Sequence, residues 1–301
     1  MESFDVVIVG GGPAGLSAAL ILGRCRRRVL VCDSGHYRNA ASHGLHGFLT
    51  RDGTEPLEFL QIARKQLLPY PSVRLQQIEV TDATGSNNGF LLTIGQNTRV
   101  TSRKLLVATG VVDHLPNIEG LASLYGRSVF HCPYCDGWEM RDRALGIYGR
   151  GQQALGLALE LTLWSRDLIL FTDGASGFTP EDFDRLRSRQ VQIHEEKIVR
   201  LAGINGKLQR IVLANNDAIA RDAMFFSTGQ HQASNLPEQL GCTITEQGCV
   251  ETGDYESTAV PGLYVAGDAS RLVQLAIVAA SEGAQAAFAI NKELLREDLA
   301  R

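Results

Sequence analysis

The sequence predicts an α/β protein of two Rossmann-like, three-layer nucleotide-binding domains, the second inserted within the first. Two glycine turns carry this prediction, at residues 10–15 and 149–154, because each follows a short apolar strand and opens a helix. Such a turn places a pyrophosphate on the helix N-terminus. The outer domain is predicted to comprise residues 1–115 and 241–301, and the inner domain residues 116–240.

The composition is that of a globular chain, with 44% hydrophobic and 21% charged residues among 301. A net charge of -4 leaves no basic excess to neutralise phosphates, so no nucleic-acid partner is expected. The N-terminus enters an apolar strand without a signal-like region, and no apolar run reaches membrane-spanning length. We therefore expect a cytoplasmic protein with no membrane partner.

The first strand, turn and helix are predicted at residues 4–9, 10–15 and 16–23. The turn contributes Gly10, Gly12, Pro13, Ala14 and Gly15. Its G-x-G-x-x-G spacing allows a tight turn, close approach of a pyrophosphate, and close packing of helix on strand. A second strand at residues 29–32 ends in Asp33, where a carboxylate can accept hydrogen bonds from a ribose.

Residues 34–53 form a long loop without periodicity, rich in Gly, His, Arg and Asn. Loops of this length inside a compact domain are usually binding segments. The candidates for holding a cofactor there are Arg38, Asn39, His43 and His46.

A helix is predicted at residues 55–68 and strands at 74–79, 89–94 and 98–107, with a turn at 85–88. The last strand runs into Ala108, Thr109 and Gly110.

The inner domain repeats the design. Its elements are a strand at 145–148, a helix at 155–163, and strands at 168–171, 191–193, 208–213 and 223–226. The outer domain then resumes with a buried strand that ends in Gly267 and Asp268, followed by a helix at 275–293. Small residues along that helix allow it to lie close to a ligand or to another backbone.

Cys132 and Cys135 stand one helical turn apart, just before the second glycine turn. Such a pair closes a disulfide or supplies half of a zinc site, and in a chain with nucleotide-binding patterns the redox interpretation is favoured. The zinc interpretation lacks a second cysteine pair, so no metal is expected. The other four cysteines are expected to be buried thiols: Cys25, Cys32, Cys242 and Cys249.

In this order, the motifs resemble those of the low-molecular-weight thioredoxin reductases over nearly the whole chain. The resemblance implies a homodimeric FAD enzyme whose FAD domain is in two pieces around a nucleotide domain that carries the redox cysteines. It implies a thioredoxin-like protein or a small-molecule disulfide as partner.

The same resemblance assigns roles to residues. The first glycine turn would bind the FAD pyrophosphate, Asp33 the adenosine ribose, and Asp268 the ribityl chain. Gln274, Leu275 and Ala276 would lie against the flavin ring, at the N-terminus of the last helix. The other predicted cofactor contacts are Ser34, Arg38, Asn39, His46, Ala108, Thr109, Gly110 and Gly267.

At the redox centre, the resemblance makes Cys135 the thiol that faces the flavin and Cys132 the thiol that exchanges with substrate. A departing thiolate must be stabilised and then protonated nearby. Asp136 would supply that proton if burial raises its pKa.

Two departures from the family concern the electron donor. Typical members carry a basic cluster for the 2′-phosphate of NADPH, whereas this chain has Thr172-Asp173 there, and an Asp suits a 2′-OH. Arg150 stands between the glycines of the second turn and crowds the pyrophosphate approach. We predict that NADPH is not the normal donor, which leaves the inner domain open to another nucleotide or a second flavin.

The loop at residues 33–53 resembles a side branch of dithiol oxidases and of disulfide reductases that work without pyridine nucleotides. Their electron partner is oxygen, ferredoxin or a second flavin. Asp136 matches the reductases, so we predict a disulfide reductase; the alternative is a dithiol oxidase that closes disulfides in small sulfur-containing metabolites with oxygen as acceptor. A flavin-containing redox sensor is a third hypothesis.

Overall fold

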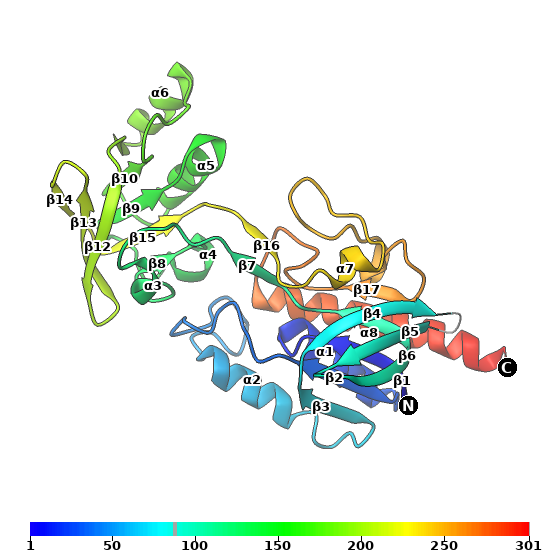
Figure 1. Ribbon diagram of the computed structural model, residues 1–301. Coiled ribbons are helices and arrows are strands. Elements are labelled where there is room, and N and C mark those ends of the chain that lie inside the picture. The colour runs from blue at the N-terminus through cyan, green and yellow to red at the C-terminus, as the bar shows by residue number, and fades with distance from the viewer. Residues whose placement is uncertain (87–88, 301) are drawn as a thin grey trace. The chain divides into compact units, whose positions relative to one another are not determined.

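The computed structural model describes residues 1–86 and 89–300. The chain folds into two compact units, and the main segment of the second, Asp113–Gly229, lies within the sequence of the first (Figure 1). The first unit resumes at Gln230 rather than at residue 241, because β16 (Gln230–Gln232) pairs with β7 (Val111–Asp113). The short segment Ala41–His46 also belongs to the second unit.

A parallel sheet forms the centre of the first unit. Strand β1 (Glu2–Val9) pairs with β2 (Val29–Asp33) on one side and β6 (Thr98–Val107) on the other. β3 (Val73–Gln77) adds to β2, and β17 (Leu263–Val265) pairs with the second half of β6. Every residue of β2 is buried, as expected for a strand covered on both faces.

An antiparallel layer covers one face of this sheet. Strands β4 (Val80–Ser86) and β5 (Gly89–Ile94) pair with each other, and β5 continues onto the first half of β6. Their apolar residues pack against Val7 and Val9 of β1. Gly85 and Ser86, predicted to lie in a turn, belong to β4; the rest of that turn, at residues 87–88, lies outside the described residues.

Helices cover the other face. Helix α1 (Pro13–Arg24) packs along α8 (Ala276–Leu299), as Figure 1 shows. A Cβ on Gly283 of α8 would stand 1.9 Å from the carbonyl oxygen of Ala14, so the two backbones approach too closely for any side chain there. The small residues predicted along this helix allow this close contact with α1. The remaining helical segments of the unit are α2 (Pro56–Lys65), α7 (Leu236–Gln239) and the 3-10 turn η1 (Asp254–Glu256).

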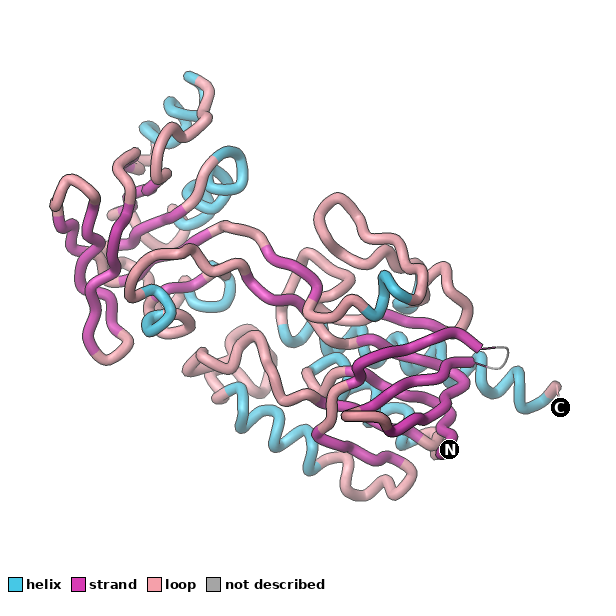
Figure 2. Tube along the Cα trace, viewed as in Figure 1, coloured by secondary structure: helices cyan, strands magenta, loops and turns pink. Residues whose placement is uncertain are grey.

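The second unit repeats the three-layer plan around a smaller parallel sheet (Figure 2). Its strand order is β11 (Gln192–His194), β10 (Leu168–Phe171), β9 (Leu145–Tyr148), β15 (Ala223–Phe226) and β8 (Val129–Phe130). Apolar residues of one face pack with α5 and α6, and those of the other with α3 and an antiparallel sheet. The elements of these layers are α3 (Leu121–Leu124), α4 (Pro133–Asp136), α5 (Gly151–Leu161), α6 (Pro180–Ser188), β12 (Ile198–Ile204), β13 (Lys207–Leu213) and β14 (Ala218–Ala220).

The prediction of two Rossmann-like, three-layer domains is therefore confirmed. Among the described residues, no helix combines the length and the apolar character needed to cross a membrane.

The contact between α1 and α8 yields a stability prediction. We expect Gly283→Ala to lower the free energy of unfolding by about 1–3 kcal/mol, because the added methyl group displaces backbone. Gly156→Ala in α5 is the matched control: no described atom lies within 4 Å of its Cβ position, so the change should stabilise the helix by about 0.5–1 kcal/mol. Urea denaturation of both variants checks this, and equal midpoints would contradict it.

Candidate functional site

The first glycine turn is tight on its inner side and open on its outer side. A Cβ on Gly10 (φ +113°) would stand 2.2 Å from the oxygen of Ala108, and one on Gly15 would stand 2.0 Å from the oxygen of Gly10. At Gly12, by contrast, no described atom lies within 4 Å of the Cβ position. Among the described residues, no side chain forms a capping hydrogen bond at the N-terminus of α1. The N–H groups of its first turn are thus placed to bind an anion such as a pyrophosphate.

Asp33 ends β2 beside this turn, with 3% of its surface exposed. Its Oδ1 accepts the Gly35 N–H at 3.0 Å, and its Oδ2 accepts the Tyr37 hydroxyl at 2.6 Å and Arg64 Nη2 at 2.8 Å. A Cβ on Gly11 would meet Oδ2 at 2.2 Å, so the carboxylate lies against the turn. Burial and the hydrogen bond to Asp33 raise the pKa of Tyr37 to about 12.

Tyr37 and Arg64 were not predicted. Tyr37 stands in the loop that was singled out, but nothing in the sequence links Arg64, on α2, to Asp33.

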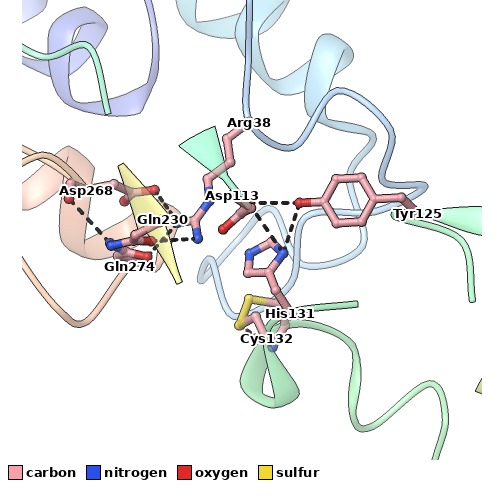
Figure 3. The surroundings of a disulfide bond; sticks show 9 residues. Arg38, Asp113, Tyr125, His131, Cys132, Gln230, Asp268 and Gln274 are labelled. Carbon is pink, nitrogen blue, oxygen red and sulfur yellow. Dashed lines mark hydrogen bonds and ion pairs between the residues drawn. A yellow bond between two sulfur atoms is a disulfide. The ribbon is translucent and has the colours of Figure 1, made fainter. Parts of the chain in front are cut away.

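Arg38, in the first segment of the first unit, contacts three residues of the last segment, Gln230–Arg301 (Figure 3). Its Nη1 donates to Asp268 Oδ2 at 2.9 Å and to Gln274 Oε1 at 2.6 Å, and its Nη2 donates to Gln230 Oε1 at 3.2 Å. Three of the predicted cofactor residues are thereby brought together, although Arg38 lies 230 residues before Asp268 and 236 before Gln274. Gln230 was not among the predicted residues.

Further predicted residues gather around Asp268. Gly110 has a Cβ position 3.9 Å from Asp268 Cβ, and that of Gly267 is 3.2 Å from Ala14 Cβ in the glycine turn. The Oγ1 of Thr109 is buried without a hydrogen-bond partner among the described residues. A buried hydroxyl without a partner is costly unless a ligand satisfies it. The arrangement therefore fits a dinucleotide that extends from the glycine turn to Asp268.

Glu282 of α8 holds the turn that carries Asp268. It is 4% exposed; its Oε2 accepts the Gly267 N–H at 2.7 Å, and its Oε1 lies 3.0 Å from Arg271 Nε. Arg271 also pairs with Glu256 at 2.7 Å. Burial raises the pKa of Glu282 to about 7. Glu282 was not predicted. In the sequence it stands out as an acidic residue within the run of small residues on α8.

The other predicted cofactor residues have individual placements. Leu275 is the N-cap of α8 and Ala276 its first residue, and within the described chain no side chain caps that helix. Ser34 is exposed and Asn39 is half-buried. His46 lies in the second unit, where its Nε2 is 3.7 Å from Glu139 Oε1.

A disulfide joins Cys132 and Cys135, whose Cα atoms are 5.3 Å apart, at the start of α4. Cys132 is the N-cap, and the Cys135 N–H donates to its Sγ at 3.2 Å. A donor directed at a sulfur favours the thiolate once the pair is reduced.

The other four cysteines were predicted to be buried thiols. This is wrong for Cys25, which is exposed because it lies at the C-terminal end of α1; the remaining three are buried.

Asp136 follows directly, and its burial, with a smaller contribution from the charge of Glu139, raises its pKa to about 7. A carboxyl with a pKa near neutrality both donates and accepts protons at that pH. Burial therefore raises the pKa of Asp136, which is what a role as proton donor to the cysteine pair would require.

The second glycine turn opens α5, with Arg150 as N-cap between two positive-φ glycines, Gly149 and Gly151. Arg150 Nε donates to the Thr172 carbonyl, and its Nη2 lies 3.5 Å from Asp173 Oδ2. The other oxygen of Asp173, Oδ1, is buried and has no hydrogen-bond partner among the described residues.

Among those residues, no group of three or more His, Cys, Asp or Glu side chains is placed to hold a metal ion.

Comparison with known proteins decides the family. The model of the pyridine nucleotide-disulphide oxidoreductase family matches residues 4–283. The chain belongs to this family. Its membership indicates a flavin-dependent oxidoreductase of the thioredoxin reductase-like class and implies FAD as cofactor.

Relatives agree with this assignment. The chain is 32% identical over 300 residues to a probable thioredoxin reductase of Arthroderma benhamiae, an alignment that covers 89% of this chain and 74% of that protein. It is 31% identical over 275 residues to the thioredoxin reductase tcpT of Claviceps purpurea, which covers 88% and 86%. The crystal structure of an oxidoreductase from Agrobacterium tumefaciens superposes with a TM-score of 0.91 at 35% identity, over 98% of this chain and 99% of that one.

The raised pKa of Asp136 yields a pH prediction. Its proton is present below about pH 7 and lost above it, so the rate of disulfide reduction should fall as the pH rises through 7. Asp136→Asn should remove this limb and lower the rate at pH 6 about a hundredfold, because the proton donor is lost. Steady-state rates between about pH 5 and 9 measure both effects.

Glu139→Gln is the companion variant. Removing the neighbouring negative charge should shift the midpoint of the limb to lower pH while the limb itself stays. A limb that persists unchanged in Asp136→Asn would assign the titration to another group.

Proposed function

We propose that this protein is an FAD-dependent disulfide reductase that passes electrons from flavin to a substrate disulfide through Cys132 and Cys135, and that NADPH is not its normal electron donor. The observation that carries the donor half of this proposal is the pairing of Arg150 with Asp173 at the second glycine turn.

The first unit supplies the residues that would hold FAD. The open face at Gly12 and the first turn of α1 would bind the pyrophosphate, and Asp33 would accept hydrogen bonds from the adenosine ribose. Asp268, held by Arg38 and by the Glu282 contact to Gly267, would bind the ribityl chain. FAD supplies the two-electron carrier; the chain binds and orients it.

At the redox centre, the Cys132–Cys135 disulfide accepts two electrons and its S–S bond breaks. Asp136 gives its proton to the thiolate of Cys135, which we assign as the flavin-facing thiol. The Cys132 thiolate, stabilised by the Cys135 N–H, then attacks one sulfur of the substrate disulfide and releases the other as a thiolate. Cys135 returns its proton to Asp136, and its thiolate attacks the Sγ of Cys132, which restores the disulfide and releases the second substrate sulfur as a thiolate.

The second unit disfavours NADPH for an electrostatic reason. A 2′-phosphate at the end of β10 would meet the carboxylate of Asp173, and Arg150 is already engaged by that carboxylate and by the Thr172 carbonyl. The buried Oδ1 of Asp173 would instead accept a hydrogen bond from a ribose hydroxyl. NADH, a second flavin or another nucleotide without a 2′-phosphate fits this site better.

The partners follow from the family. We assign a thioredoxin-like protein or a small-molecule disulfide as substrate, and a homodimer as the assembly, which light scattering of the purified protein tests.

Anaerobic titration of the purified holoprotein tests the donor. NADPH should bleach the flavin absorbance at least about tenfold more slowly than turnover requires, whereas dithionite should bleach it fully. Asp173→Asn, which removes the repelling charge, should bind NADPH more tightly than the parent protein. Rapid bleaching of the parent by stoichiometric NADPH would overturn this half of the proposal, and a flavin-to-protein ratio of two would place a second flavin in the chain.

The cysteines and the direction of transfer need a separate measurement. Cys132→Ser and Cys135→Ser should each abolish disulfide reduction while flavin content stays unchanged, because neither sulfur can be replaced in the exchange. Oxygen uptake with simple dithiols at turnover rate would assign the reverse direction, that of a dithiol oxidase. Partner binding that survives in Cys135→Ser without any turnover would indicate a sensor.

A further inference from the structure

Asp113, Tyr125 and His131 form a hydrogen-bonded group directly before the redox cysteines (Figure 3). The Tyr125 hydroxyl donates to Asp113 Oδ2 at 2.8 Å and lies 3.1 Å from His131 Nδ1. The same Nδ1 is 3.7 Å from Asp113 Oδ2. All three residues belong to the second unit.

Each residue is fixed by a different element. Asp113 ends β7 with only 7% of its side chain exposed, and Tyr125 is the C-cap of α3. His131 follows β8 and precedes Cys132, and its ring packs against Phe226 with centroids 6.4 Å apart. The imidazole is therefore held by both its nitrogen and its face.

The hydrogen bonds fix the proton on one ring nitrogen. A hydroxyl has a single hydrogen, and that of Tyr125 is given to Asp113. The Tyr125 oxygen must then accept from His131, which places a hydrogen on Nδ1. A hydrogen on Nδ1 leaves Nε2 able to take up a second proton, and the carboxylate of Asp113, 3.7 Å from Nδ1, would stabilise the positively charged ring that results.

We propose that His131 is a positioning residue for the redox pair: held by Asp113 and Tyr125, its imidazolium favours the thiolate form of Cys132 in the reduced protein. This inference rests on the proposed function, in which Cys132 attacks the substrate disulfide.

The chemistry requires a thiolate at this step. Reduction of the disulfide leaves Cys132 as a thiolate, which attacks one substrate sulfur, and the substrate S–S bond breaks as a second thiolate leaves. A positive charge on the preceding residue stabilises the attacking thiolate, as an imidazolium does beside other reactive cysteines. Two carboxyls lie beside the pair: Asp136, which is neutral below about pH 7, and Glu139, which is 3.7 Å from His46 Nε2. A charged His131 would offset whatever negative charge these carboxyls carry.

Alkylation of the reduced thiol tests this without flavin chemistry or substrate. The parent for the test is the Cys25→Ser, Cys135→Ser variant, because Cys25 is exposed and would react as well. Its rate of alkylation by iodoacetamide, followed at Cys132 by peptide mass spectrometry, is measured against pH. His131→Gln in this background should move the midpoint up by about one pH unit, and so slow alkylation about tenfold below that midpoint.

Two further variants serve as a comparison and as a control. Tyr125→Phe retains the ring packing and should move the midpoint in the same direction by less, because the Asp113 contact to His131 remains. His194→Gln is the matched control: its Nδ1 is 3.9 Å from Glu196, so it removes a histidine with a carboxylate partner from the same unit and should leave the midpoint unchanged. Unchanged thermal unfolding of the variants separates the effect from misfolding.

Two outcomes are distinguishable. A midpoint unaffected by His131→Gln, in a parent that still forms a mixed disulfide with cystine, would overturn the inference and leave the proposed function standing. A Cys132 that forms no mixed disulfide in the parent would overturn the proposed function itself.

Discussion

The approach of backbone to backbone around the first glycine turn is the constraint on which the first unit depends. The turn meets β6 at Ala108, its helix meets α8 at Gly283, and the residue before Asp268 meets Ala14. Each contact leaves no room for a side chain or only for a small one. As a result, three segments that are distant in sequence converge at one edge of the sheet, where Asp33, Thr109 and Asp268 lie.

The second unit uses the same architecture with different electrostatics. Its glycine turn also opens a helix after a parallel strand, but an Arg is the N-cap and an Asp at the end of the next strand engages it. Under the proposed function, this turn would present a hydroxyl acceptor rather than a phosphate site, because a single carboxylate would decide the sign of the local charge.

The redox centre is a balance of charges within that unit. Asp136 is desolvated and lies near Glu139, so it retains a proton up to about pH 7. The Cys135 N–H donates to Cys132 Sγ, and in the inference above the His131 imidazolium would favour a thiolate there as well. The two sulfurs therefore stand in different surroundings although only two residues separate them. This asymmetry suits a pair in which one thiol receives electrons and a proton and the other attacks substrate.

Sequence patterns were enough to predict the two glycine turns, the strands and helices beside them, the cysteine pair and the resemblance of their order to a family, because these signals are local patterns of spacing and periodicity. They also indicated Asp136 and Asp173. Which side chains meet became known from the folded structure alone: Arg64 with Asp33, Glu282 with Gly267, and Asp113 and Tyr125 with His131. These contacts depend on how separate elements pack, and a single sequence carries no local trace of them.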